Sequence, residues 1–207
     1  MTMIAARRRT LLTGVAAVAA TALLAAPAAA SVAPAGAGCP HRAVAQPFTP
    51  WSDSADYFLV PNGGFEQGAT SWVLRGSAAV AVGNEPFRVA APRDTHSLRL
   101  PAGSSATTSA FCIGVEHRTM RFFTNAAASS SLNVDAVIDG PGGTQRTVRM
   151  GTVRGSGKWA PSAIVPMVVN ALAAQPGNAM NVRLRFTPFG SAAWSIDDVF
   201  VDPFNRG

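Results

Sequence analysis

Residues 60–74, VPNGGFEQGATSWVL, combine an apolar entry, a glycine-rich bend, an aromatic–acid pair, a polar loop and an apolar exit. Asn62-Gly63-Gly64 predicts a bend into a first strand, because glycine tolerates the positive φ that other residues avoid. Phe65 is expected to turn into the core. Gly68 to Ser71 has the composition of a loop, and Trp72 is expected to begin the next strand. A bend, a loop and a strand in such short succession are typical of all-β proteins.

The rest of the chain continues as short apolar runs separated by Gly, Pro, Asn, Asp and Ser. Apolar and polar residues alternate most clearly over 132–138 and 182–186, which predicts strands with one buried face. Gly140 to Gly143 predicts a hairpin turn, and only 170–174 suggests a helical turn. Further strands are expected at 57–60, 72–75, 78–82, 97–100, 107–113, 120–124, 144–153, 163–169 and 194–201. Without alternating helices, this pattern predicts an all-β, antiparallel β-sandwich.

The amino-terminal residues have the organisation of an export signal. Arg7 to Arg9 precede an apolar run from Leu11 to Ala26, and Ala28-Ala29-Ala30 offers a cleavage site. Arg8-Arg9-Thr10-Leu11-Leu12 also matches a twin-arginine signal. An uncleaved membrane anchor is disfavoured, because the run is alanine-rich and too short to span a bilayer comfortably. We expect a signal peptide, an Ala/Pro/Gly-rich tether and one β-sandwich domain, at 1–30, 31–56 and 57–207.

Charge and cysteine content narrow the class of protein. Half of the formal net charge of +6 comes from Arg7, Arg8 and Arg9 in the expected signal. The remaining basic residues are scattered, whereas a nucleic-acid-binding protein concentrates them. Two cysteines in an exported chain predict one disulfide, Cys39–Cys112, which would contribute about 4 kcal/mol in the chain-entropy model.

The sequence shows no catalytic constellation. There is no GxSxG motif, and His41, His96 and His117 lie far apart in the chain. Gly155 to Lys158 resembles the end of a phosphate loop, but Trp159 occupies the place of the magnesium-binding Ser or Thr. A glycosidase needs two facing carboxylates, and the scattered acids here single out no pair. We therefore expect a protein that is not an enzyme.

One pair of acids stands apart from the others. In Ile196-Asp197-Asp198-Val199 one aspartate should point inward, because neighbouring strand residues face opposite sides. A buried carboxylate is costly unless it is paired or bound to metal. If the first and last strands are neighbours, Glu66 could join Asp197 or Asp198 in an oxygen-ligand site for calcium. The alternative is that Glu66 caps the backbone amides of its own turn and the aspartates form surface or turn hydrogen bonds.

The segments PNGGFEQGATSW and AAWSIDDVFVD resemble the two ends of jelly-roll modules of the galactose-binding-like superfamily, which includes carbohydrate-binding modules. The segment THSLRLPAGSSATTSAFCI is similar to that superfamily's central strand region. The likeness extends from Val60 to Asp202. It implies a jelly roll in a bacterial secreted protein, with structural calcium held at positions matching Glu66 and Asp197 or Asp198.

The resemblance also implies a non-catalytic module that recognises polysaccharide or cell-wall glycan. Sugar rings stack on aromatic side chains, and the candidates are Trp51, Tyr57, Trp72, Phe87, Phe123, Trp159 and Trp194. Of these, we predict that Tyr57, Phe87 and Trp159 bind the ligand. Residues 132–138, expected on the concave sheet, include no aromatic. The alternative hypothesis is a secreted structural or protein-interaction sandwich without a sugar site, whose partner is a cell-surface protein. Neither hypothesis involves nucleic acid, or a membrane once the signal is cleaved.

Overall fold

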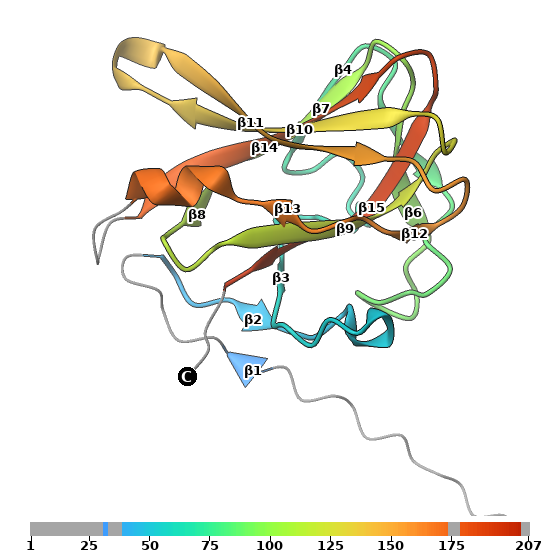
Figure 1. Cartoon of the computed structure of the whole chain (residues 1–207), viewed down its shortest axis with the longest axis horizontal. Helices are drawn as coiled ribbons and strands as arrows, with labels where there is room; N and C mark the ends of the chain where they lie inside the picture. The colour runs from blue at the N-terminus through green and yellow to red at the C-terminus, as the bar shows by residue number, and fades with distance from the viewer. Residues whose placement is uncertain (1–30, 33–38, 174–178, 204–207) are drawn as a thin grey trace, which may run out of the picture.

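The computed structural model describes residues 31–32, 39–173 and 179–203, which form two antiparallel sheets packed face to face (Figure 1). The fold-class prediction of an all-β antiparallel sandwich is confirmed. The predicted signal peptide, 1–30, lies outside the described residues. Within the described part of the chain, no helix is both long and apolar enough to cross a membrane.

Sheet I has the strand order β11-β10-β14-β7-β4, with β8 also paired to β14. Its strands are β4 (Trp72–Arg75), β7 (Ser105–Thr108), β8 (Phe111–Ile113), β10 (Ser131–Asp139), β11 (Gln145–Arg154) and β14 (Met180–Phe189). Sheet II has the order β12-β9-β15-β6-β5, with β13 paired to β9 and β3 to β15. Its strands are β3 (Phe58–Leu59), β5 (Ala79–Val82), β6 (His96–Leu100), β9 (Thr119–Asn125), β12 (Ala160–Pro161), β13 (Val165–Pro166) and β15 (Trp194–Asp202).

Period-2 alternation builds the core between the two sheets. In β14, Val182, Leu184 and Phe186 are fully buried, while Arg183 and Arg185 between them face outward. Burying side chains of this size contributes about 1.5–3 kcal/mol each. The ring of Phe186 also meets Phe122 of β9 edge to face, with centroids 5.1 Å apart. The alternation predicted for 132–138 and 182–186 is therefore present, and it directs one face of each strand inward.

Two of the expected strands are divided in the structure. The strand expected at 107–113 is split between β7 and β8. The strand expected at 163–169 is the short β13 followed by the 3₁₀ helix η3 (Val168–Ala173). Proline accounts for the second division, since Pro166 has no amide hydrogen with which to extend the ladder. The turn expected at 140–143 contains η2 (Pro141–Gly143).

The glycine bend has a different cause from the one predicted. Asn62 and Phe65 adopt positive φ, whereas Gly63 and Gly64 do not. A Cβ on Gly63 would lie 2.8 Å from the carbonyl oxygen of Val199, and one on Gly64 would lie 2.9 Å from Oδ1 of Asp198. The glycines are needed for close packing against β15, so the prediction of positive φ at these positions was wrong.

The segment 43–57, which we call the strap, crosses the outer face of sheet II (Figure 1). It contains β2 (Ala43–Val44), which pairs with β1 (Ser31–Val32), and η1 (Thr49–Trp51). Phe48 is fully buried against Phe123 and Phe200 of sheet II. The strap thus packs against the domain, because Phe48 covers the rings of Phe123 and Phe200 on the outer face of sheet II.

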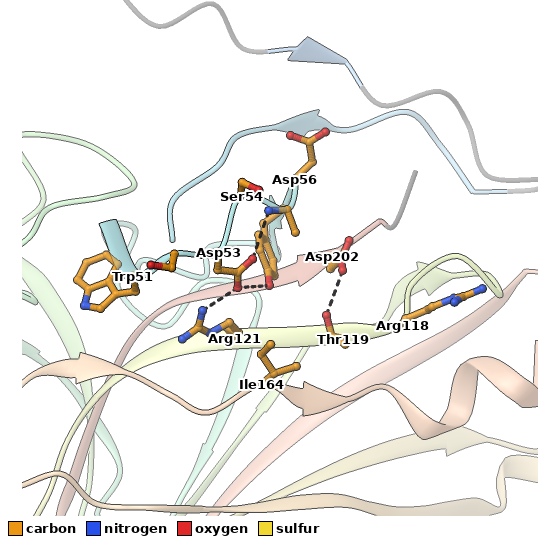
Figure 2. Close-up of a pocket in the computed structure, with 12 residues that line it drawn as sticks. Trp51, Asp53, Ser54, Asp56, Arg118, Thr119, Arg121, Ile164 and Asp202 are labelled. Atoms are coloured by element: carbon orange, nitrogen blue, oxygen red, sulfur yellow. Dashed lines mark hydrogen bonds and ion pairs between the residues drawn. The ribbon is translucent and has the colours of Figure 1, made fainter. Parts of the chain in front are cut away.

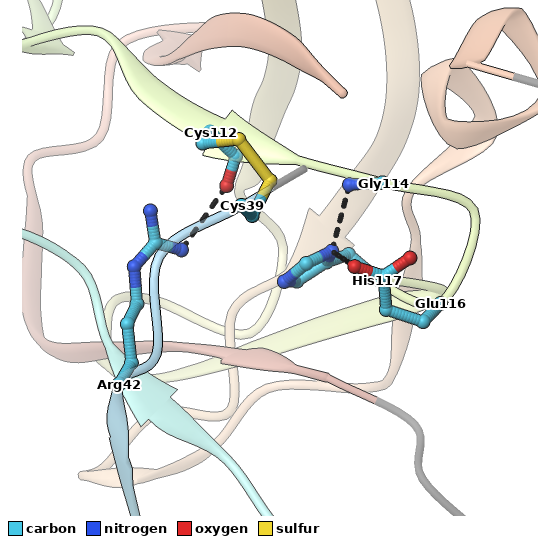
Figure 3. Close-up of a disulfide and its surroundings, with 6 residues drawn as sticks. All are labelled: Cys39, Arg42, Cys112, Gly114, Glu116 and His117. Carbon is cyan, nitrogen blue, oxygen red and sulfur yellow. Dashed lines mark hydrogen bonds and ion pairs between the residues drawn. A yellow bond between two sulfur atoms is a disulfide. The ribbon is translucent and has the colours of Figure 1, made fainter. Parts of the chain in front are cut away.

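The disulfide is formed between Cys39 and Cys112, as predicted (Figure 3). It joins the chain before the strap to β8, across 73 residues of sequence. Arg42 lies beside it and donates a hydrogen bond from Nη1 to the Cys112 carbonyl at 3.1 Å. The Arg42 guanidinium also lies 4.3 Å from the centroid of the Phe58 ring. The strap is therefore attached to the sandwich at its start by covalent and polar contacts.

Candidate functional site

A bulge in β15 positions the two predicted aspartates. The register between β15 and β9 shifts between Asp197 and Phe200, and Asp198 takes a φ of 48°. Both aspartates are fully buried. The expectation that only one would point inward was wrong, because a bulge breaks the alternation of side chains along a strand. The first and last strands of the domain, β3 and β15, are neighbours as expected.

Two acids that the sequence did not single out complete a buried carboxylate cluster. Glu85 and Asp94 belong to the loop between β5 and β6, and both are buried. The amide of Glu85 donates to Oδ2 of Asp197 at 3.2 Å, across 112 residues of sequence. The Glu85 carboxylate in turn accepts the amides of Phe87 and Val89 and so shapes its own loop.

Asp198 is the anomaly in this cluster. Among the described residues, no hydrogen bond of standard geometry reaches either of its buried carboxylate oxygens, although the Ala90 amide and the Glu85 carboxyl lie near enough to affect its pKa. The ideal Cβ position of Gly64 lies 2.9 Å from Asp198 Oδ1 and 4.0 Å from Asp94 Oδ2, so these two oxygens border the same bend. Buried carboxylate oxygens without partners are costly. In the described part of the chain, no well-aligned donor compensates these two oxygens.

The electrostatics of the cluster lead to the same conclusion. Burial raises the pKa of Asp198 to about 8, and the charges of Glu85 and Asp94 add to the rise. Burial, followed by the charge of Asp198, raises the pKa of Asp197 to about 9. Within the described ranges, none of these four acids forms an ion pair. Without a cation, these raised pKa values leave Asp197 and Asp198 largely protonated at neutral pH, and a bound cation would stabilise their ionised forms instead.

Glu66 lies next to this cluster with its carboxylate already engaged. It accepts the amides of Thr95 and His96 at 2.8 and 2.7 Å, and it contacts Nδ1 of His96 at 3.1 Å. Its charge also contributes, after burial, to a raised pKa of Asp94. The structure thus places Glu66 as a cap for the start of β6, which differs from the alternative hypothesis, in which Glu66 would cap the amides of its own turn.

The ligand chemistry of the cluster suits a hard cation, since all of its side-chain donors are carboxylate oxygens. As the side chains stand, no three Asp, Glu, His or Cys groups in the described residues already surround a common metal position. The fit therefore rests on the unpartnered oxygens of Asp198 and on the gathering of four buried carboxyl groups. No sequence signal connected Glu85 and Asp94 to Asp197, because their proximity depends on how the β5–β6 loop folds over β15.

The partly exposed aromatic side chains gather elsewhere, on the outer face of sheet II. Trp51 of the strap and Phe87 of the β5–β6 loop meet edge to face, with centroids 4.8 Å apart. Both rings contact Phe123 of β9, at 5.3 and 5.6 Å. Trp159 packs against the same buried cluster from the loop before β12. We call Trp51, Phe87 and Trp159 the aromatic ridge.

Tyr57 does not belong to the exposed surface. Its side chain is 1% exposed, and its ring packs against Phe48 at 4.9 Å. The prediction of Tyr57 as a sugar-stacking residue is corrected on this ground, because a buried ring offers no face to a ligand. Phe87, in contrast, is 45% exposed and Trp159 is partly exposed. Trp51 was named among the aromatic candidates but not among the predicted ligand-binding residues. Its sequence context gave no indication that the strap would bring it to this surface.

A cleft of about 860 Å³, which we call the strap cleft, opens beside Trp51 (Figure 2). The strap forms one side of it, and β9 and Ile164 form the other. Arg121 of β9 donates from Nη1 to Oδ2 of Asp53 at 2.7 Å, and the Tyr57 hydroxyl donates to the same oxygen at 2.9 Å. Thr119 Oγ1 donates to Asp202 Oδ2 at 3.1 Å. The cleft therefore presents polar groups in fixed positions next to an aromatic ring.

Of the aspartates that line this cleft, Asp53 is held as a carboxylate. Burial alone would raise the pKa of Asp53, but hydrogen bonds from Arg121 and Tyr57 outweigh it and lower the pKa. A general acid for glycoside cleavage needs a raised pKa so that it can deliver a proton. Asp53 is arranged for hydrogen bonding rather than for proton donation.

A second cleft, of about 350 Å³, lies at the other end of the same face. Trp159 borders it, together with Ser97 of β6 and Ser195 of β15. The aromatic ridge therefore has a cleft with polar groups at each of its two tryptophans. This outer face of sheet II combines exposed ring surfaces with hydrogen-bonding side chains.

The fold is an antiparallel β-sandwich whose outer sheet faces differ in chemistry. No protein-family model matches the sequence, and no curated protein matches it. Among solved structures, the CBM22-1 xylan-binding domain from Paenibacillus barcinonensis Xyn10C matches with 16% identity and a TM-score of 0.46, over 68% of this chain and 90% of that one. TmCBM61, in complex with β-1,4-galactotriose, matches with 16% identity and a TM-score of 0.41, over 69% of this chain and 96% of that one.

A longer structure also matches. It holds the CBM22-1 and GH10 modules of Clostridium thermocellum endo-1,4-β-D-xylanase 10B with xylohexaose, at 12% identity and a TM-score of 0.44. The match covers 68% of this chain and 27% of that one. These structures include carbohydrate-binding modules, the group that the two end motifs of the sequence resemble.

Proposed function

We propose that the protein binds polysaccharide on the outer face of sheet II and does not cleave it. The observation that carries the proposal is the Trp51–Phe87 pair, whose rings meet at 4.8 Å beside the strap cleft. Such rings stack against the apolar C–H faces of sugars. Ser52, Ser54 and Asp56 of the strap also line this cleft and offer oxygen atoms to sugar hydroxyls, and a few polar groups in a concave site are what set the orientation of a ligand.

The aromatic ridge is supported from beneath, which suits a binding surface. Phe123 is fully buried and contacts both Trp51 and Phe87. Because the supporting ring is fixed by the core, the two upper rings lose little conformational freedom when a ligand binds. Trp159 extends the ridge toward the second cleft. A chain of several sugar units, rather than a single sugar, is the ligand that this arrangement fits.

The test is a binding assay with residues 31–207 on a panel of neutral polysaccharides that includes xylan, galactan and peptidoglycan glycan, with calcium present. We expect saturable binding to one class. Trp51→Ala and Phe87→Ala should each weaken it roughly tenfold or more, since a lost stacking ring costs about 0.5–1.5 kcal/mol beyond its buried area. Isothermal titration calorimetry measures the change in Kd.

Phe189→Ala is the matched control. Phe189 is 69% exposed and lies at the end of β14 in the other sheet, so its loss should leave the Kd unchanged. Binding that survives both ridge substitutions would remove the ridge from the proposal. An absence of binding to every polysaccharide would instead favour the hypothesis of a protein-interaction sandwich.

We also propose that the buried carboxylate cluster holds a calcium ion with a structural role. The proposal is supported by the unpartnered oxygens of Asp198, which lie near Asp94 at the Gly64 bend. Asp197 and Glu85 add further carboxylates to the same buried region. Calcium accepts six to eight oxygen ligands, including backbone carbonyls, in flexible geometry. The ion would attach the β5–β6 loop, and therefore Phe87, to β15.

We infer that the protein is exported through the twin-arginine route and works outside the cell. The arginine pair and apolar run at the amino terminus support this proposal. The Cys39–Cys112 disulfide also supports it, because such bonds persist in oxidising compartments. Polysaccharide and cell-wall glycan are ligands available there.

A further inference from the structure

The outer face of sheet I, opposite the aromatic ridge, carries a groove of about 540 Å³. Arg75 of β4 and Arg183 and Arg185 of β14 line it, with the hydroxyl side chains of Ser105 and Thr107 of β7. We call it the arginine groove. Its lining residues include no acidic side chain.

The strand register explains why these arginines share one face. Arg185 lies opposite Thr107, and Arg75 lies opposite Ser105. Strand β7 runs between β14 and β4, so a strip of hydroxyl groups separates the arginines on its two sides. Neighbouring strands are about 4.8 Å apart, which places the two arginine-bearing strands roughly 10 Å apart. The groove thus has a polar floor and positive charge along both sides.

Part of this positive charge has no ion-pair partner among the described residues. Arg183 forms an ion pair with Asp139, and farther out on the same face Arg149 of β11 forms one with Asp135. For Arg75 and Arg185, no ion pair exists within the described part of the chain. Arg185 Nε makes only a long contact of 3.4 Å with Thr107 Oγ1. Two guanidinium groups are therefore available to an anion.

The chemistry of the groove selects among anions. Guanidinium groups match carboxylates in two-point hydrogen bonds, and serine and threonine hydroxyls bond to sugar hydroxyls. Grooves for single-stranded nucleic acid place aromatic rings among the basic residues, but the lining here contains no ring. We propose that the arginine groove binds the carboxylate groups of an acidic polysaccharide. The proposal does not rest on the aromatic ridge, because the two sites lie on different sheets.

The experiment compares binding to polygalacturonate, as the carboxylate-bearing probe, with binding to dextran sulfate, neutral dextran and single-stranded DNA. We expect polygalacturonate to bind with an affinity that falls as salt rises, because screening weakens exposed charge contacts. Arg75→Gln and Arg185→Gln should each raise the Kd several-fold, and the double variant should raise it roughly tenfold or more. Neutral dextran should not bind.

Arg146→Gln is the matched control, with the same loss of charge. Arg146 is exposed on β11, but it alternates with Gln145 and Thr147 and so points to the other face of the sheet. If this control weakened binding as much as the groove variants did, net charge alone would explain the effect and the groove would be excluded. Equal binding of DNA or of dextran sulfate would overturn the assignment to carboxylate polysaccharide.

A second set of variants separates this site from the aromatic ridge. Trp51→Ala and Phe87→Ala should leave polygalacturonate binding unchanged, whatever they do to neutral polysaccharide. Loss of polygalacturonate binding in those variants, with retention in Arg75→Gln and Arg185→Gln, would overturn the arginine groove. No binding of polygalacturonate at low salt would overturn it as well.

Discussion

At the scale of single residues, Asp198 has the environment that most clearly indicates a bound cation. It combines positive φ, complete burial and two unpartnered carboxylate oxygens. Backbone strain and unpaired buried polar atoms each cost about 1–3 kcal/mol, and such features persist where function requires them. Gly64 is kept without a side chain by the same residue. Asp198 is therefore the residue at which the calcium proposal is best tested.

Removal of calcium should lower the melting temperature of the wild-type protein. Ligand at a hundredfold excess over its Kd stabilises by about 2.7 kcal/mol. For a domain of this size that corresponds to roughly 5–10 °C. Asp198→Asn should abolish the response to chelator. Above about pH 9, where both aspartates are ionised, it should also melt higher than the wild-type protein in chelator, because one of the two mutually repelling carboxylates is gone. Differential scanning calorimetry measures both effects.

Asp139→Asn serves as the control for this experiment, since Asp139 is half-exposed and lies outside the carboxylate cluster. It should keep the full response to chelator. A wild-type melting temperature that does not change on chelation would contradict the proposal that a cation binds at Asp198.

At the scale of elements, the strap determines what the outer face of sheet II can do. It covers Phe123 and Phe200 with Phe48, and it brings Trp51 against Phe87. Its polar attachment is Asp53, which is bound by Arg121 and Tyr57 and by the amide of Ala55. These contacts stabilise the ionised form of Asp53 and lower its pKa. The strap is therefore attached by a contact that depends on pH.

The strap should loosen in acid. Because the folded-state pKa of Asp53 is lowered, its stabilising contribution is present above its ordinary pKa of about 3.9 and is lost as pH falls through the folded value. Asp53→Asn should lower the free energy of unfolding by about 2 kcal/mol at pH 7. Below pH 4 the free energy of unfolding should decrease less steeply with falling pH in this variant than in the wild-type protein. Urea titrations monitored by tryptophan fluorescence at several pH values measure this.

Asp56→Asn is the control, because Asp56 has a single hydrogen bond from Gln46 on the exposed side of the strap. Its stability should stay within about 0.5 kcal/mol of the wild-type value at every pH. If the free energy of unfolding fell equally in acid for Asp53→Asn and for the wild-type protein, the loss of stability at low pH would come from another group.

At the scale of the whole molecule, the sandwich offers two outer surfaces of contrasting chemistry. Sheet II presents aromatic rings between clefts, whereas sheet I presents arginines and hydroxyl groups. The two surfaces are joined through one core, in which Phe122 of sheet II packs on Phe186 of sheet I. The Cys39–Cys112 bond attaches the chain before the strap to sheet I, so it links the strap to the opposite layer.

The exported protein should begin near Ser31 and contain no free thiol. Reduction should destabilise it, because the bond closes a long loop in the unfolded chain and such bonds contribute about 2–4 kcal/mol. Intact-mass spectrometry of the secreted protein, with and without reductant, measures the amino terminus and the thiol count. A mass that includes residues 1–30, or the presence of two free thiols, would contradict the export proposal.

The sequence by itself determined the strands and the fold class. Alternation depends only on near neighbours in the chain, so Trp72–Arg75 was predicted with its observed bounds and the inward faces of β10 and β14 were correct. That the first and last strands are neighbours was a premise taken from other sandwiches, and the pairing of β3 with β15 agrees with it. The disulfide followed from a count of two cysteines.

Only the tertiary structure decided which side chains meet. Glu85 contacts Asp197 across 112 residues of sequence, and Trp51 meets Phe87 because the strap and the β5–β6 loop cross the same sheet. The bulge at Asp198 reversed the expected alternation, and burial removed Tyr57 from the candidate surface. Local patterns cannot reveal such contacts, because they form between segments whose approach is determined by how the whole sandwich packs.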